Sequence, residues 1–194
     1  MEKAEILKDG TKVLIRDQTG EDLDILMDFY QALPDEDRRY LRVDVTDRDV
    51  VKQRLELSKG GYLFRRGALE NDRVVATGAL EIFPDAWREH QGEIRVIVSQ
   101  DFRHRGLGLV LMRELYLMAL DKNVELLVTR LLRPQIAARN ICRKLGFREE
   151  LLVPDYLHDL TGTTQDMVLM AADMKDFWKE LEHVYMDSDW SKYR

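Results

Sequence analysis

The chain contains few of the residues that cross-link or interrupt a fold. Its 194 residues include one cysteine, four prolines and four histidines. The single cysteine, Cys142, excludes an internal disulfide bond. The histidines are not spaced like metal ligands, either with one another or with Cys142, so we predict that the protein holds no metal. The prolines fall between periodic segments, which indicates that they separate elements within one domain.

Long apolar runs and an excess of positive charge are also missing. No run approaches the ~20 residues that a membrane-spanning helix needs, and residues 1–5 lack the apolar core of a signal peptide. We therefore expect a cytoplasmic protein that does not contact membranes. The net charge of −6 disfavours nucleic acid as a partner, because such binding depends on clustered positive charge.

The residues that are present are typical of one globular domain. Hydrophobic residues make up 45% of the chain and charged residues 34%, and one domain commonly spans about 100–200 residues. We predict a single domain over residues 1–194, in which residues 174–194 form a C-terminal helix and tail. The aromatic face of that helix fits either the core or a subunit contact, which leaves a homodimer open.

Hydrophobic periodicity predicts an alternation of strands and helices. Strands are expected over residues 12–16, 62–69, 74–83, 93–98, 125–131, 147–153 and 166–170, and helices over residues 23–33, 46–60, 107–121, 135–145 and 174–185. Residues 34–45 are expected to form an exposed connection. The strand, helix and strand over residues 93–131 imply a parallel strand pair, with the connecting turn at the carboxyl end of the first strand.

That turn carries the most informative motif, Arg-His-Arg-Gly-Leu-Gly at residues 103–108. Two glycines at the start of a helix let the backbone approach a ligand closely, and the first N–H groups of the helix favour an anion. Taken alone, the string also fits an ordinary glycine turn whose arginines point into water.

A second motif, Lys-Leu-Gly-Phe at residues 144–147, follows the next expected helix. Together the two motifs and the order of elements resemble the GCN5-related N-acetyltransferases, the GNAT family. The resemblance implies an α/β (α+β) fold: a single GNAT-like domain with a mixed, mostly antiparallel sheet, a central parallel strand pair and flanking helices. Residues 34–42 and 92–108 are also similar to the bacterial protein-lysine acetyltransferase branch.

The resemblance implies that acetyl-CoA is the acyl donor, used without a metal. The backbone of residues 103–108 would hold the pyrophosphate, and strand residues Ile97 and Val98 would pair with the pantetheine arm. Gln135 stands where the family commonly has an asparagine that contacts the cofactor. The cofactor-binding residues implied in this way are Ile97, Val98, Arg103, His104, Arg105, Gly106, Leu107, Gly108 and Gln135.

The resemblance also implies two catalytic residues, Glu93 and Cys142. An alkylammonium must lose a proton before it attacks a thioester, and Glu93 lies where the lysine acetyltransferase branch has its general base. Alternatively, Glu93 is a solvated glutamate at the edge of a strand. Glu81, on the preceding strand, is then the reserve candidate for the general base. Cys142 stands where the family often has a tyrosine that donates a proton to the leaving thiolate. Alternatively, Cys142 is a small hydrophobic residue buried in the core.

The acceptor expected from this reasoning is a primary amine, on a protein lysine or on a small molecule. Asp35, Glu36, Asp37 and Asp155 favour a cationic acceptor, although neighbouring arginines dilute that signal. Asp155, Tyr156, His158 and Asp159 are expected in a loop that lines an amine pocket, or else in a polar surface loop. The competing function is a GNAT-like module that binds acetyl-CoA as a sensor without turnover; an interaction domain built around the last helix is a third reading.

Overall fold

The computed structural model describes residues 2–187, apart from the side chains of Tyr185 and Asp187. Its eight strands form one sheet in the order β1-β2-β3-β4-β5-β6-β8-β7. The strands are β1 (Lys3–Ile6), β2 (Lys12–Asp17), β3 (Leu63–Glu70), β4 (Arg73–Ile82), β5 (Gln91–Val98), β6 (Leu126–Leu132), β7 (Arg148–His158) and β8 (Thr164–Asp173). The helices are α1 (Leu23–Gln31), α2 (Asp35–Arg38), α3 (Arg48–Glu56), α4 (Leu107–Asp121), α5 (Ile136–Lys144) and α6 (Met174–Asp187).

The predicted fold class is confirmed. Strands β5 and β6 form the parallel pair, and the other neighbouring strands pair antiparallel. Helix α4 connects β5 to β6, as a parallel crossover requires. None of the helices within residues 2–187 is both long and apolar enough to span a bilayer.

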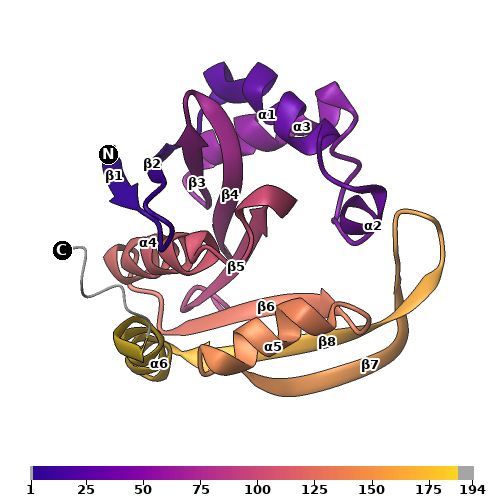
Figure 1. The fold of residues 1–194 in the computed structure, drawn as a ribbon. Helices are drawn as coiled ribbons and strands as arrows, with labels where there is room; N and C mark the ends of the chain where they lie inside the picture. Colours follow the sequence, from indigo (N-terminus) through magenta and orange to yellow (C-terminus); the bar gives the residue numbers. More distant parts are fainter. Residues whose placement is uncertain (1, 188–194) are drawn as a thin grey trace.

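The parallel pair is short, and this shapes the centre of the sheet. Only Gln91, Gly92 and Glu93 of β5 are in register with β6. Beyond Glu93, β5 continues beside β4 as far as Val98, and β6 continues beside β8 as far as Leu132. The two strands therefore diverge, and Figure 1 shows the gap between them opening from the end that they share.

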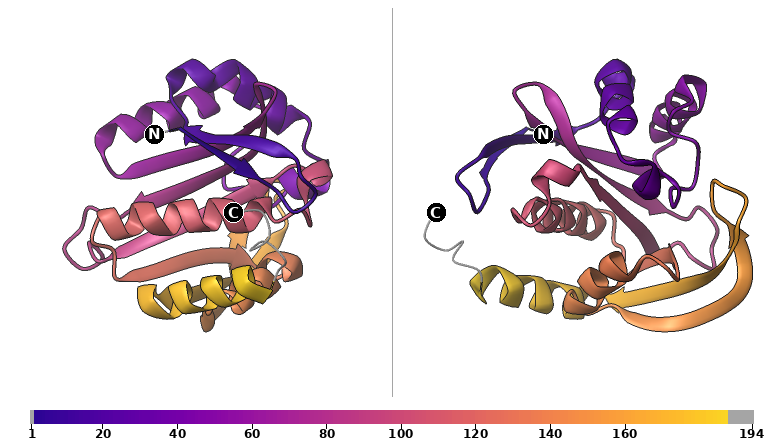
Figure 2. Two further views of the ribbon diagram at one scale, coloured as in Figure 1. Left: turned by 60° about the vertical axis from the view of Figure 1, so that its left-hand side comes forward. Right: turned by 45° about the vertical axis from the view of Figure 1, so that its right-hand side comes forward.

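Helices cover the sheet from both sides (Figure 2). Helix α4 places Leu107, Leu111 and Leu115 at a spacing of four residues, so all three fall on one face, and all three are fully buried. Helix α6 lies on the same side, where Phe177 and Leu181 join that core. The apolar face of α6 therefore packs in the core. The predicted tail over residues 188–194 lies outside the described residues.

Helices α1 and α3 cover the opposite face, and the segment between them corrects one prediction. Residues 34–45 were expected to form an exposed connection, but they include α2 and bury Val45. Nε of Arg39 lies 2.7 Å from Oδ2 of Asp159 in the β7–β8 turn. This segment therefore joins the α1–α3 layer to the β7–β8 hairpin, because a buried carboxylate needs a partner of opposite charge.

The two edge strands of the sheet, β7 and β1, correct two more expectations. Strand β7 extends to His158, so Asp155, Tyr156 and His158 lie in a strand and not in a loop. Asp155 occupies an irregular stretch of that strand, with a φ of 49°. Strand β1 was not predicted, because its four residues carry only a weak alternation of exposed and half-buried side chains.

Candidate active site

The loop between β5 and α4 turns its backbone amides inward. His104 and Gly106 have left-handed φ values of 63° and 87°, and α4 begins at the next residue, Leu107. Left-handed residues in such a turn make successive N–H groups point into one concave site. Within the described part of the chain, the N–H groups of residues 104–108 donate no hydrogen bond. The loop thus offers several donors to an anion.

The two arginines of this loop do not leave free charges beside the amides. Arg103 forms an ion pair with Asp37 of α2, and its Nε donates to the carbonyl oxygen of Val98 at 3.3 Å. Nη1 of Arg105 lies 3.0 Å from Oδ2 of Asp9, and its guanidinium stacks over Phe102. The anion site is therefore formed mainly by backbone groups.

Gly108 has open space where a side chain would begin. A Cβ added there would meet only Cγ2 of Val98, at an ordinary contact distance of 3.7 Å. A glycine inside a helix costs about 0.5–1 kcal/mol relative to alanine, and packing within the protein does not require one here. A ligand-binding role of Gly108 stays a prediction, and the open space beside it is compatible with a close approach of a ligand.

The register of β5 decides which of its backbone groups face the gap. Ser99 N–H donates to the carbonyl oxygen of Val75 at 2.9 Å, and antiparallel pairs alternate between bonded and non-bonded residues. The backbone of Ile97 therefore faces β4, whereas the backbones of Val96 and Val98 face the gap toward β6. This orientation is consistent with the pantetheine role predicted for Val98 and turns the backbone of Ile97 away from the gap, and both roles stay predictions.

Gln135 has a local role in the structure. Its side-chain oxygen accepts a hydrogen bond from the N–H of Leu132 at 2.8 Å, at the end of β6. This contact closes the turn into α5 and uses the carbonyl that a cofactor would otherwise contact. A cofactor role for Gln135 stays a prediction that rests on the resemblance alone.

Glu93 lies at the point where β5 and β6 separate, and its side chain is fully buried. It forms an ion pair with Arg42, and it accepts from Nη2 of Arg130 at 2.5 Å and from the N–H of Arg130 at 3.3 Å. Burial raises the pKa of this carboxyl, but the hydrogen bonds from Arg42 and Arg130 outweigh it and lower the pKa to about 2. Glu93 is therefore buried and ionised, unlike the solvated glutamate of the alternative reading. Neither arginine partner was predicted.

These ion pairs predict a loss of stability in acid. The lowered pKa of Glu93 stabilises the fold above its ordinary value near 4.5, and this contribution disappears as the pH falls toward about 2. The contribution is at most about 3 kcal/mol, and less after screening, because the arginine side chains are 32% and 38% exposed. Urea unfolding between pH 6 and pH 3 should show a steeper decline for the wild type than for Glu93→Gln. Parallel declines would contradict the assignment.

Cys142 packs inside the core formed by α4, α5 and α6. Burial raises the pKa of its thiol to about 12, and only 5% of the residue is exposed. These surroundings match the buried alternative and are unsuited to proton donation at neutral pH. Among residues 2–187, no cluster of three or more His, Cys, Asp or Glu side chains is placed to hold a metal ion.

Two of the four acids that favoured a cationic acceptor, Asp35 and Asp37, form ion pairs, and so does Asp159, which was expected in the amine-pocket loop. Asp35 forms an ion pair with Arg38, and Asp37 does so with Arg103. Asp159 accepts from Arg39 and also from Gln165 at 2.9 Å. The structure therefore uses these carboxylates to hold loops together.

The chain was then compared with known proteins. The Acetyltransferase (GNAT) family profile matches residues 24–147, which include both motifs. No curated protein sequence matches the chain. The structure resembles many solved structures at low sequence identity, which supports the fold.

Three of these structures illustrate the similarity. The GNAT domain of S. lividans PAT has a TM-score of 0.75 and 17% identity, covering 89% of this chain and 96% of that domain. A ribosomal-protein-alanine N-acetyltransferase from Brucella melitensis has a TM-score of 0.70 and 24% identity, covering 82% and 98%. A putative acetyltransferase from Salmonella typhimurium, solved with acetyl-CoA, has a TM-score of 0.70 and 18% identity, covering 84% and 94%.

The profile match covers most of the chain and contains the inward-turned amides, the diverging strands and the buried Glu93. The chain therefore belongs to the acetyltransferase (GNAT) family and is an acetyl-CoA-dependent N-acetyltransferase.

Proposed function

We propose that the protein transfers the acetyl group to a primary amine by direct attack, with Glu93 as the residue that receives the amine proton. One observation carries this proposal: the separation of β5 and β6 starts at Glu93. The buried carboxylate, the free edge of β5 and the amides before α4 therefore belong to one gap. Direct transfer needs the donor and the proton acceptor in the same place.

The donor side of the gap consists of backbone groups. The N–H groups of residues 104–108 would hold the pyrophosphate, as helix N-termini commonly do. The backbones of Val96 and Val98 would pair with the pantetheine arm as a further strand does. When bound, acetyl-CoA supplies the acetyl thioester. The N–H of Val98 is placed to donate to an oxygen that gains negative charge during acyl transfer.

The acceptor side must remove a proton. An alkylammonium has an ordinary pKa of about 10.4, and only the neutral amine is a nucleophile. Glu93 is ionised at neutral pH, but a carboxylate held by two guanidinium groups is a weak base. Arg42 follows α2 in the segment before α3, and its side chain is 32% exposed. Its departure from Glu93 would raise the basicity of the carboxylate as the acceptor enters.

A panel of amines tests the proposal. The protein is incubated with acetyl-CoA and, separately, with a lysine peptide, spermidine, L-glutamate and L-aspartate, and thiol release is recorded together with the mass of the acetylated amine. We expect amine-dependent thiol release at a rate well above that of hydrolysis. If the protein binds CoA but releases no thiol with any amine, it is a sensor and not an enzyme for these acceptors. If the protein itself is acetylated before the acetyl group reaches the amine, direct attack is excluded.

A further inference from the structure

A cavity adjoins the gap between β5 and β6, on the face of the sheet that α1 and α3 cover. Its floor is formed by β4 and β5, and its sides are formed by α1, α3, β3 and the segment before α3. The cavity encloses about 90 Å³. For comparison, an engineered apolar cavity of about 150 Å³ binds benzene. The space therefore suits a small molecule or a small head group.

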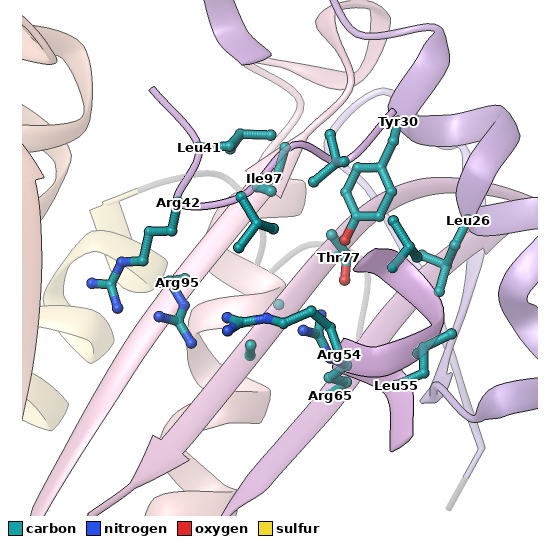
Figure 3. Close-up of a pocket in the computed structure, with 15 residues that line it drawn as sticks. Leu26, Tyr30, Leu41, Arg42, Arg54, Leu55, Arg65, Thr77, Arg95 and Ile97 are labelled. Carbon is teal, nitrogen blue, oxygen red and sulfur yellow. The ribbon is translucent and has the colours of Figure 1, made fainter. Parts of the chain in front are cut away.

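Four arginines line this cavity, each from a different part of the chain. They are Arg42, Arg54 of α3, Arg65 of β3 and Arg95 of β5. Figure 3 shows the guanidinium groups of Arg54, Arg65 and Arg95 converging on one space, with Arg42 beside them. Arginine side chains are costly to bring together, since like charges in a partly buried site repel each other.

The carboxylates that contact these arginines are too few to balance them. Glu93 pairs with Arg42, and Oε2 of Glu81 accepts from Nη2 of Arg95 at 2.6 Å. Within residues 2–187, Arg54 makes no hydrogen bond or ion pair, and the carboxylate that acts on it, Glu81, is already paired with Arg95. Two carboxylates thus face four guanidinium groups, which leaves an excess of two positive charges.

Some of the donors are also buried without an acceptor. Nε of Arg65 and Nη1 of Arg95 are inaccessible to solvent and make no hydrogen bond among the described residues, although Nη1 of Arg95 lies 4.0 Å from Oε2 of Glu93. Burial lowers the pKa of Arg54, Arg65 and Arg95, and a neighbouring arginine lowers the pKa of each of them further. Unsatisfied buried donors cost free energy, which a bound anion would recover.

The remaining wall is apolar. Leu26, Val45, Val51 and Leu55 are buried side chains that line the cavity, and Tyr30 lies among them. Guanidinium groups present a fork of N–H donors that matches the oxygens of a carboxylate or a phosphate. The cavity thus combines an anion receptor with a short hydrophobic wall.

We propose that this cavity binds the acceptor of the acetyl transfer, and that the acceptor is a small amine carrying an acidic group, a carboxylate or a phosphate, rather than a polycation. The inference rests on the proposed function, since the cavity adjoins Glu93 through Arg42. An acidic group in the cavity would also compete with Glu93 for Arg42. Binding of the acceptor would then leave Glu93 paired with Arg130 but not with Arg42, which would raise the basicity of the carboxylate that receives the proton.

The binding test uses the protein without acetyl-CoA. Glutarate and inorganic phosphate, which cannot be acetylated, are titrated by calorimetry at an ionic strength fixed with sodium chloride, beside the neutral analogue glutaramide. We expect at least one of the two anions, and not glutaramide, to bind; the stronger of the two identifies the acidic group. Arg54→Gln should weaken that binding about tenfold or more, because one charge-assisted interaction is lost.

The matched control is Arg48→Gln, on the same helix. Arg48 is exposed, pairs with Asp24 and lies outside the cavity, so its loss should leave anion binding unchanged. Because Arg54 forms no ion pair among the described residues, its replacement leaves no carboxylate unpaired. Arg54→Gln should therefore fold and bind CoA as the wild type does. Equal anion affinity in the wild type and Arg54→Gln, or no anion binding in a protein that binds CoA, would overturn the acidic acceptor and leave the proposed acetyl transfer intact. Failure to bind CoA would overturn the proposed function instead.

Acetylation gives an independent readout. Among acceptors, L-glutamate, L-aspartate and O-phosphoethanolamine should have a higher kcat/KM than spermidine or a neutral amine of similar size. Arg54→Gln should lower kcat/KM for the acidic amines mainly through KM, since it acts on binding. A preference for spermidine or for a lysine peptide would contradict an acidic acceptor.

Discussion

Glu93→Gln is expected to lower kcat for acetyl transfer by about 100-fold to 10,000-fold, the range that a positioned proton acceptor contributes. The substitution preserves the size of the side chain, but the amide nitrogen that replaces one oxygen donates and cannot accept. One oxygen is left to accept from Arg42 and Arg130, and the site that receives a proton is lost. Steady-state kinetics at saturating acetyl-CoA and acceptor measure the effect. CoA affinity should change little, because Glu93 lies apart from the amides of residues 104–108.

Glu81→Gln distinguishes the reserve base from Glu93. Glu81 is directly opposite Glu93 in the register of β4 and β5, and it pairs with Arg95. If Glu93 receives the proton, Glu81→Gln should reduce kcat less than tenfold and act chiefly on acceptor KM. A large loss of kcat in Glu81→Gln, together with an active Glu93→Gln, would move the role to Glu81.

Gly108→Glu is expected to change stability and donor affinity in opposite directions. The structure has room for a Cβ at this position, glutamate is a better helix former than glycine, and a negative charge is favourable in the first turn of a helix. The free energy of unfolding should therefore stay constant or rise by about 1 kcal/mol. CoA affinity should fall by about 100-fold or more, because a carboxylate would occupy and repel the anion site. Thermal unfolding and CoA titration measure the two effects.

The donor site was largely predictable because its signals are local in the sequence. The glycines at residues 106 and 108 directly follow a strand and precede a helix with a clear apolar face, and each of these patterns depends on nearby residues only. The strand, helix and strand order also predicted the parallel pair. The choice between Ile97 and Val96 needed the pairing with β4, which strand alternation alone does not determine.

The acceptor side was not predictable, because its contacts join distant parts of the chain. Arg42 is 51 residues from Glu93 in the sequence, and Arg130 is 37 residues away. In the sequence, Arg42 belongs to a segment of mixed charge that is typical of an exposed connection. Its contact with a buried carboxylate exists only after α1, α3 and β5 have packed together.

The arginine cavity illustrates the same limit. Glu93, Arg95 and Ile97 alternate with Ile94 and Val96 along β5, which indicates that the charged residues share one face of the sheet. The sequence does not reveal that Arg54 and Arg65 meet this face. In the sequence, Arg42 together with Arg38 and Arg39 only diluted the signal of nearby acids, and the expected acceptor stayed a primary amine of either kind.

Calorimetric titration of CoA into the wild-type protein and into Gly108→Glu tests whether the loop between β5 and α4 holds the acyl donor. We predict one CoA site in the wild type, and an affinity at least about 100-fold lower in a Gly108→Glu protein that unfolds no more easily than the wild type. Equal affinities in the two folded proteins, or no CoA binding to the wild type, would contradict this role of the loop.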